Sequence, residues 1–326
     1  MARVYRPNPP RHRRVLQKAA IRPVGHRAEV AGSSETSRLR SVNEPQMCPS
    51  TQLRFQNACP PPRPLARWPR VNSFGHFILT RFNVPLRFDL PPNQQPAPRG
   101  LDPDWLARRF ELFERVCLAS VARQTEPDFQ WLVFLDEATP PAFRDRLGAL
   151  AAAHSYLQPV YCSRFDDETV LPEIRRRETP GRLRITTRLD NDDAIHPTLI
   201  ARVRHLAERQ APRQDLSRGF FISFPIGCCE LEGAFYLQRY RYNPFASYVS
   251  APETDRTVLG ADHRYVADVA PVVVAWCRPT WCQTIHGENV ANRLRGVYWP
   301  GGRRSEFGRY THPPATQRVA LIHDRI

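Results

Sequence analysis

The sequence predicts an α/β protein in which a mixed sheet is flanked by helices. In residues 74–163, short apolar runs typical of buried strands alternate with segments whose apolar residues recur at helical spacing. Such alternation favours a parallel sheet built from strand–helix–strand units. Between residues 219 and 286, apolar runs follow one another with fewer helices between them, which indicates further strands of mixed direction.

The first half of this region contains three predicted strands and two predicted helices. A helix is expected to begin at Asp102, which precedes a proline at the first helical position. Its core-facing residues at helical spacing are Leu106, Phe110, Phe113, Cys117 and Val121. The other elements are a strand at 74–84, a strand buried on both faces at 129–136, a helix at 140–154 and a strand at 158–163.

The second half contains four apolar runs that read as paired strands. GFFISFPIG (219–227) and LEGAFYLQRY (231–240) predict two adjacent strands joined by a short turn. A second such pair is predicted at 271–276 and 281–286. Residues 71–300 are therefore expected to form a single domain with a substantial core.

The net charge of +15 is concentrated near the N-terminus. Residues 1–70 hold 14 basic and 3 acidic residues, against 33 and 29 in the rest of the chain. This segment is rich in Pro and Arg and lacks apolar periodicity, so we expect a disordered basic arm. Met47 offers an alternative start, which would leave residues 1–46 untranslated. Residues 301–326 are expected to form a C-terminal tail.

Cysteine usage and hydropathy indicate a reduced, cytoplasmic protein. The cysteines show no CxxC pair and no Cys/His spacing typical of zinc sites, and several lie in apolar runs. A disulfide between Cys277 and Cys282 is an alternative. The chain has no recognisable secretory signal and no apolar run of about 18 residues, the length that would cross a membrane.

The stretch ITTRLDNDDA (185–194) is the strongest candidate functional motif. If the strand continues through it, alternate side chains share a face, so Asp190 and Asp192 are predicted to point the same way. Two such carboxylates repel each other unless a cation lies between them. At the carboxyl end of a strand in an open α/β sheet they would face the crevice where ligands bind. Hard oxygen ligands suit Mg²⁺ or Mn²⁺ carrying a diphosphate.

A structural interpretation of the same aspartates is also open. Aspartates are favoured at helix N-termini, and Pro197 followed by LIARVRHLAERQ predicts a helix start. Capping explains Asp193 well. It explains Asp190 and Asp192 poorly, because they follow a strand pattern and precede the helix by several residues.

Four segments occur in order along the predicted domain: TRFNV (80–84), LFERVCLASVARQT with WLVFLDE (112–137), ITTRLDNDDA (185–194) and IHGENVANR (285–293). Together they resemble glycosyltransferases of the GT-A type, and more narrowly the bacterial family of putative rhamnosyltransferases. The resemblance covers roughly residues 74–300. It implies a GT-A-like (nucleotide-diphospho-sugar transferase) fold and transfer of a sugar from a nucleotide-sugar donor.

The resemblance also implies a metal site. Asp190 and Asp192 match the Asp-x-Asp motif that holds Mn²⁺ or Mg²⁺ against the donor diphosphate, with Asp193 as an additional acid. His286 matches a later histidine that completes the metal or diphosphate site. A neutral imidazole is a competent ligand, although a histidine at a strand end can equally be hydrogen-bonded only.

The remaining donor contacts implied by the resemblance lie at strand ends and in one turn. Asp136 matches the acid that contacts the base or ribose of the nucleotide, and Arg81 lies where the first strand meets the nucleotide. Gln124 lies in the turn SVARQT (120–125), which resembles the opening of the wider inverting GT-A families.

The chemistry of sugar transfer needs a cation at the leaving diphosphate and a base at the acceptor hydroxyl. Arg188 is the candidate cation, although on a strand it can also pair with an acid structurally. Asp262 is the first candidate for the base, His263 the second and Glu253 the third.

Two other functional classes stay open. A nucleotidyltransferase could use the same metal site, but Gly75 stands alone near the first strand, where a Gly-rich phosphate loop would be expected. A non-enzymatic nucleic-acid-binding protein could use the basic arm, although its scattered charges indicate no specific site. The expected acceptor is a glycan, a lipid-linked sugar or a small molecule. The basic charge is compatible with peripheral association with a membrane.

Overall fold

The computed structural model describes residues 74–85, 99–288 and 294–307, all within one compact unit. The predicted arm at residues 1–70 lies outside this part of the chain, as do residues 308–326 of the predicted tail.

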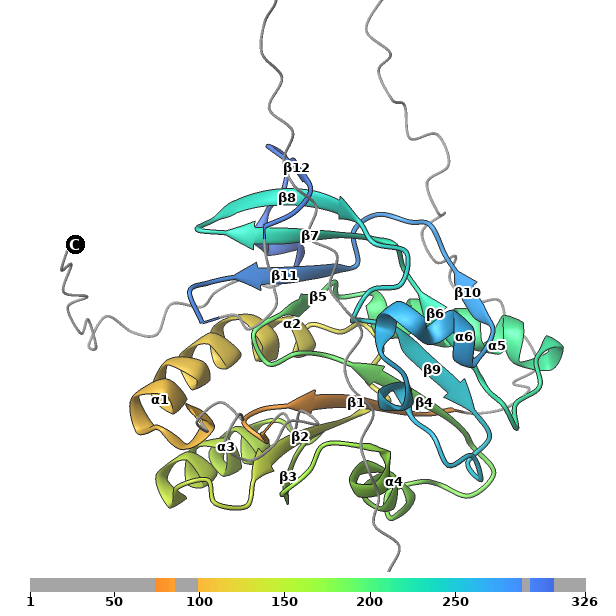
Figure 1. Cartoon of the computed structure of the whole chain (residues 1–326), viewed down its shortest axis with the longest axis horizontal. Helices are drawn as coiled ribbons and strands as arrows, with labels where there is room; N and C mark the ends of the chain where they lie inside the picture. Colours follow the sequence, from red (N-terminus) through yellow and green to blue (C-terminus); the bar gives the residue numbers. More distant parts are fainter. Residues whose placement is uncertain (1–73, 86–98, 289–293, 308–326) are drawn as a thin grey trace, which may run out of the picture. The chain divides into compact units, whose positions relative to one another are not determined.

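A seven-stranded sheet forms the centre of the fold (Figure 1), in the order β10-β6-β9-β4-β1-β2-β3. Its strands are β1 (Phe74–Arg81), β2 (Gln130–Asp136), β3 (Leu157–Cys162), β4 (Leu183–Arg188), β6 (Phe220–Ser223), β9 (Ser247–Ser250) and β10 (Val272–Val274). Strand β9 runs antiparallel to both neighbours, whereas β1 pairs in parallel with β2 and β4, β2 with β3, and β6 with β10.

A second, five-stranded sheet has the order β12-β8-β7-β11-β5. Its strands are β5 (Ala194–Ile195), β7 (Ile226–Leu231), β8 (Ala234–Arg239), β11 (Trp281–Ile285) and β12 (Val297–Tyr298). Strand β5 directly follows the aspartate cluster, so the chain passes from the large sheet to the small one through that cluster.

Helices cover both faces of the large sheet. They are α1 (Pro103–Leu112), the π-helical segment η3 (Phe113–Leu118), α2 (Ala119–Val121), α3 (Pro141–Ala153), α4 (Asp167–Arg175), α5 (Leu199–Gln210) and α6 (Val266–Val269). Residues of α1, α3 and α5 pack in one core with Ile78 and Trp131, whereas residues of α4 and α6 pack in another with Phe77 and Leu132. The neighbours on β1 and β2 alternate between the two cores, as strand geometry requires. The predicted GT-A-like class, a mixed sheet flanked by helices, is confirmed.

The elements predicted in the first half are confirmed with small shifts at their ends. Helix α1 begins as expected, because the Asp102 side chain accepts a hydrogen bond from the Trp105 backbone N–H at 2.7 Å. All five residues expected at helical spacing are buried. The helical path continues without a break through η3 and α2.

The strand pairs predicted in the second half are wrong in part. The run 219–227 splits at Pro225 into β6, which lies in the large sheet, and the start of β7, which forms the hairpin with β8 in the small sheet. The runs 271–276 and 281–286 do not pair, because β10 joins β6 and β11 joins β7 and β5. Apolar composition identifies buried strands but does not specify their partners.

Helix α4 and strand β9 are among the elements that were not predicted. Helix α4 is capped by Asp166, whose Oδ1 accepts from the Thr169 N–H at 3.0 Å, but Pro172 inside the helix obscures its pattern. Strand β9 has four residues, too few to establish a period.

The packed domain extends past the predicted boundary at residue 300. Phe307 is buried against Phe235 and Cys282 of the small sheet. Cys277 and Cys282 are both free thiols, so the alternative disulfide is not formed. Among the helices of the described residues, none is long and apolar enough to span a membrane.

Candidate active site

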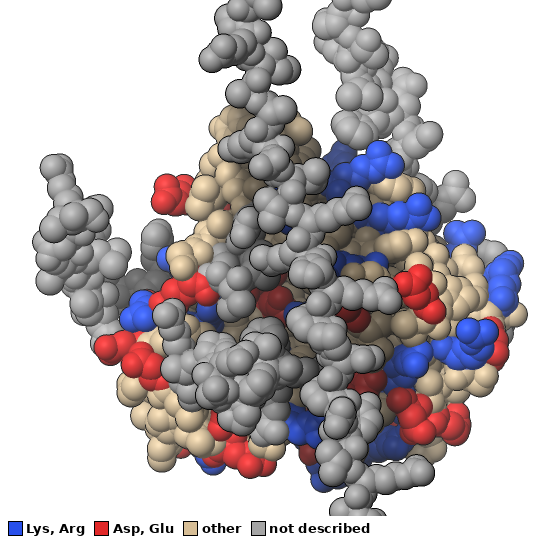
Figure 2. All heavy atoms as spheres, viewed as in Figure 1, with Lys and Arg blue, Asp and Glu red and all other residues tan. Residues whose placement is uncertain are grey.

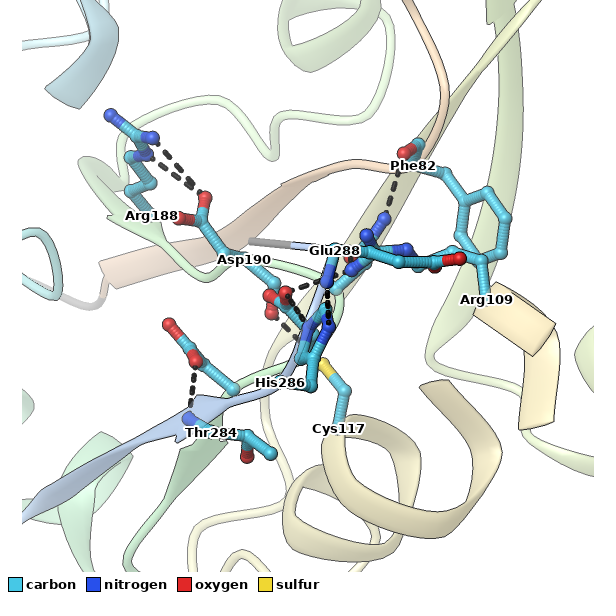
Figure 3. A network of polar contacts seen from close by, with 11 residues as sticks. Phe82, Arg109, Cys117, Arg188, Asp190, Thr284, His286 and Glu288 are labelled. Atoms are coloured by element: carbon cyan, nitrogen blue, oxygen red, sulfur yellow. Dashed lines mark hydrogen bonds and ion pairs between the residues drawn. The ribbon is translucent and has the colours of Figure 1, made fainter. Parts of the chain in front are cut away.

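The candidate site lies where the two sheets meet. The parallel strands β1, β2 and β4 end at one edge of the large sheet with Arg81, Asp136 and Arg188. The turn that holds the aspartates follows β4, and β11 of the small sheet ends beside it with Ile285, just before His286. Figure 3 shows the side chains that converge on this turn.

The aspartates do not continue a strand, so the predicted alternation of faces is wrong. Strand β4 ends at Arg188, and the Asp193 N–H donates to the Asp190 carbonyl at 3.2 Å, which closes a turn. Asp190 is about one-third exposed, whereas Asp192 is buried. The two carboxylates therefore have different partners, because a turn aims successive side chains differently from a strand.

Asp192 is held by two cationic or proton-donating groups. Its Oδ2 lies 2.8 Å from Arg109 Nη1 and 2.9 Å from His286 Nε2. Burial favours the neutral carboxyl, but the His286 hydrogen bond and the Arg109 charge together hold the pKa of Asp192 below its usual range. Asp192 is thus ionised at neutral pH.

Asp193 is completely buried beneath its neighbours. Its Oδ1 accepts from the Thr284 N–H at 2.9 Å, and its Oδ2 has no hydrogen-bond partner among the described residues. Burial, together with the charges of Asp192 and Asp190, raises the pKa of Asp193 well above its usual value. Asp193 does not cap the following helix, which begins at Leu199.

Asp190 faces the arginines at the edge of the site. Its Oδ1 accepts from Arg188 Nε and Nη2 at 3.3 and 3.2 Å (Figure 3). The Asp190 charge raises the pKa of Arg188. Burial lowers the pKa of Arg81, and the charge of Asp190 opposes that shift. Arg81 also donates to the Val84 carbonyl at 2.8 Å. The structure therefore brings Arg81, Arg188 and Asp190 together.

His286 uses both ring nitrogens. Nδ1 accepts from the Glu288 backbone N–H at 3.2 Å, which leaves Nε2 to donate to Asp192. Across the described part of the chain, no group of three or more His, Cys, Asp or Glu side chains is arranged to hold a metal ion.

Two site residues were missed by sequence reasoning. Arg109 is buried, and it bonds Asn191 Oδ1 at 3.2 Å as well as Asp192. Asn191 in turn donates to the Phe82 carbonyl at 2.7 Å, which ties the turn to the end of β1. The available signal was the position of Arg109 beside Leu106 and Phe110, on the apolar side of its helix.

Asp136 and Gln124 bond nearby backbone groups. Asp136 Oδ1 accepts from the Ala138 N–H at 2.7 Å at the end of β2. Gln124 donates to the His196 carbonyl at 3.0 Å and accepts from the Ile200 N–H at 3.2 Å. Gln124 thereby fixes the start of α5, with both its amide nitrogen and its amide oxygen engaged by backbone groups.

The first two candidate bases, Asp262 and His263, are neighbours with different hydrogen-bond partners. Asp262 caps η6 (His263–Tyr265) and holds Arg264 through both carboxylate oxygens, and that hydrogen-bonded pair places its pKa far below the usual range. His263 Nε2 lies 2.9 Å from the Tyr240 hydroxyl. Burial lowers the pKa of His263, and the charge of Asp262, 3.6 Å from its Nδ1, opposes that shift; the charges of Arg188 and Asp190 at the aspartate turn also act on it.

Glu253 lies at the opposite end of the sheet. It follows β9, whose last residue Ser250 pairs with Arg184 near the start of β4. Because β4 ends at the aspartate turn, Glu253 is separated from the turn by the length of that strand.

A comparison with known families identifies the class to which this α/β protein belongs. The family described as "Putative rhamnosyl transferase" matches residues 79–298. The match covers more than half of the chain, and the protein belongs to this family.

Solved structures show only distant similarity. The Staphylococcus aureus protein TarS (residues 1–349, in complex with UDP) has 10% identity and a TM-score of 0.39, over 65% of this chain and 60% of that one. A 4-diphosphocytidyl-2C-methyl-D-erythritol synthase from Anaerococcus prevotii has 9% identity and a TM-score of 0.30, over 62% and 86%. This chain therefore spans about three-fifths of the length of the TarS chain. A comparison with curated proteins gave no match.

Proposed function

We propose that the protein transfers a sugar, rhamnose by the family description, from a nucleoside diphosphate donor to an acceptor hydroxyl with the help of Mg²⁺ or Mn²⁺. The observation that carries this proposal is the meeting of Asp190, Asp192 and His286 with Arg81 and Arg188 beyond the carboxyl ends of parallel strands. This is the edge at which α/β sheets bind nucleotides.

The donor atoms at the turn fit a divalent cation. Asp192 Oδ2 and His286 Nε2 lie 2.9 Å apart, and a cation held by both would require the imidazole proton to move from Nε2 to Nδ1, in place of the hydrogen bond from the Glu288 N–H. Two adjacent ligands of a six-coordinate Mg²⁺ with bonds of about 2.1 Å are separated by about 3 Å. Asp193 Oδ2 adds a buried carboxyl oxygen that has no hydrogen-bond partner within the described residues. Since Mg²⁺ usually keeps several waters and takes substrate phosphates as ligands, two protein donors are enough.

The protein's own side chains then act on the two ends of the transfer. A bound cation would neutralise the diphosphate as its bond to the sugar breaks. Arg81 and Arg188 add fixed positive charge beside the leaving group, where it is worth more than in water because both side chains are partly buried. Asp190 holds Arg188 in place for this role.

For the acceptor we assign a proton relay to Tyr240 and His263. Neutral His263 is the better base at pH 7, because Asp262 is committed to Arg264 and binds protons weakly. The acceptor hydroxyl gives its proton to the Tyr240 oxygen while the phenolic proton passes to His263 Nε2, 2.9 Å away. The acceptor oxygen then bonds the sugar as the nucleoside diphosphate leaves.

The donor half is tested by calorimetry with UDP, dTDP and GDP, each with and without Mn²⁺. We expect at least one of them to bind in the presence of Mn²⁺ and to bind at least tenfold more weakly after chelation. The absence of binding by all three with Mn²⁺ present would contradict the proposal.

The acceptor half predicts different effects at neighbouring residues. Tyr240→Phe and His263→Gln are each expected to lower kcat by about 10²–10⁴-fold, the usual contribution of acid–base catalysis, while nucleotide affinity is retained. Asp262→Asn is expected to lower kcat less than tenfold. Because burial lowers the pKa of His263, kcat/KM should reach its plateau at a lower pH than it would with a histidine of ordinary pKa as the base. A larger loss in Asp262→Asn than in His263→Gln would reverse the assignment.

A further inference from the structure

Trp276 is an exposed tryptophan with an arginine over its ring. Trp276 is 46% exposed and lies just after the end of strand β10. The Arg239 guanidinium lies over its ring at 4.3 Å from the ring centre. An exposed aromatic ring with a cation over one face can stack against a sugar ring.

This pair lies beside the proposed proton relay. Arg239 ends β8 and precedes Tyr240, whose hydroxyl bonds His263. The segment that carries Trp276 is fixed to the same region, because the Ala275 N–H donates to the Ser223 carbonyl at 2.9 Å and Ser223 Oγ donates to the Arg241 carbonyl at 2.7 Å. A molecule stacked on Trp276 would therefore lie in the same region of the fold as Tyr240 and His263.

The surface around the pair is basic. The sequence contains no acidic residue between Glu232 and Glu253, or between Asp268 and Glu288. Within these segments Arg239 and Arg241 are exposed, and neither pairs with a carboxylate in the part of the chain that the structure describes. Figure 2 shows basic side chains gathered at the upper right of the visible face, where Figure 1 places β10 and the carboxyl end of β8.

We propose that Trp276, Arg239 and Arg241 form the acceptor subsite and select a saccharide that carries an anionic group, a carboxylate or a phosphate. The sugar ring stacks on Trp276 and the anion meets the two arginines. The inference rests on the proposed function, because it names the acceptor class of the same site.

A membrane surface fits these residues less well. Binding at a lipid interface needs several apolar side chains on one face. Trp276 is instead flanked by Arg239 and by the exposed Arg278, and its ring is occupied on one side by a guanidinium.

Trigalacturonate tests the carboxylate form and glucose 6-phosphate the phosphate form, by calorimetry on the full chain. The matched neutral probes are the methyl ester of trigalacturonate and methyl glucoside. The variants are Trp276→Ala and Arg239→Gln. The control variants are Tyr161→Ala and Arg144→Gln, which break another exposed aromatic–arginine stack of 4.8 Å, on the edge strand β3 at the far side of the sheet. UDP binding with Mn²⁺ is measured in every variant.

We expect one anionic probe to bind at least tenfold more tightly than its neutral counterpart and to lose at least tenfold in affinity in Trp276→Ala and in Arg239→Gln. The control variants should keep that affinity, and all variants should bind UDP as the wild type does. Equal binding of anionic and neutral probes, or equal losses in the control variants, would overturn the proposal. So would Trp276-dependent binding to phosphatidylglycerol vesicles with no binding of either saccharide. If none of UDP, dTDP and GDP binds the wild type with Mn²⁺, the donor proposal is contradicted, while the comparison of saccharides still decides this one.

Discussion

Replacing Asp192 by Asn is expected to lower kcat/KM for sugar transfer at least ~100-fold, about 2.7 kcal/mol of transition-state stabilisation. Asp192 is the carboxylate on which Arg109 and His286 meet, and in the proposed function it is the main protein oxygen at the diphosphate. The amide keeps the shape but loses the charge. Steady-state kinetics and nucleotide calorimetry measure the effect.

The same substitution leaves Arg109 without its carboxylate, so some destabilisation is expected as well. Two controls separate the effects. Asp128→Asn removes a carboxylate that also contacts two arginines, Arg182 and Arg204, but it precedes β2 at the opposite edge of the sheet and should leave transfer unchanged. The double variant Asp192→Asn/Arg109→Met should recover thermal stability without recovering transfer. Recovery of transfer in that double variant would show that Asp192 acts only on folding.

The substitution Gly227→Ala is expected to destabilise the fold by about 3 kcal/mol, which lowers Tm by roughly 6–12 °C. A methyl group at this position would lie 2.1–2.3 Å from three ring atoms of Trp281. The ring cannot move aside easily, because Trp281 is fully buried, stacks on Phe245 at 5.0 Å and donates through its indole N–H to the Phe224 carbonyl at 2.8 Å. Thermal and denaturant unfolding measure the loss.

Gly148→Ala is the matched control for this prediction. Gly148 lies inside α3, and an added methyl group there meets no atom within 4 Å. The change should stabilise the protein by up to about 1 kcal/mol, because glycine is unfavourable inside helices. A destabilisation by Gly148→Ala similar to that by Gly227→Ala would contradict the explanation by steric contact with Trp281.

The sequence predicted those parts of the fold that depend on local pattern. The helical spacing from Leu106 to Val121 and the apolar runs of β1, β2 and β3 are strong periodic signals, and each forms the expected element. Strand partners in the second half depend on contacts distant in sequence. The run 219–227 therefore reads as one strand, although Pro225 divides it between two sheets.

The candidate site was predicted by residue type better than by geometry. The structure places His286 beside Asp192 and Arg188 beside Asp190, while their roles in metal and diphosphate binding stay predictions. The predicted orientation of the aspartates was wrong, because a β-branched run followed by polar residues does not show where the strand ends. Arg109 lies 83 positions before Asp192, so no local spacing could link them. The proposed base changes from Asp262 to His263 for a similar reason. The sequence shows that Arg264 is close to Asp262, but it does not show that Arg264 bonds both oxygens of the Asp262 carboxylate.

The position of the aspartate turn between the two sheets affects the stability of the ligand-bound protein. The chain passes from the large sheet to the small one through residues 189–193. In this turn, the Asp192 carboxylate contacts Arg109, on a helix packed against the large sheet, and His286, at the end of a strand of the small sheet. A ligand seated there would share its free energy of binding between both sheets. Mass action would then add about 2.7 kcal/mol against unfolding at a ligand concentration one hundred times Kd. The ligand-bound protein would unfold cooperatively and resist heat and proteolysis better than the free protein. The concentration of substrate would therefore also affect the lifetime of the protein.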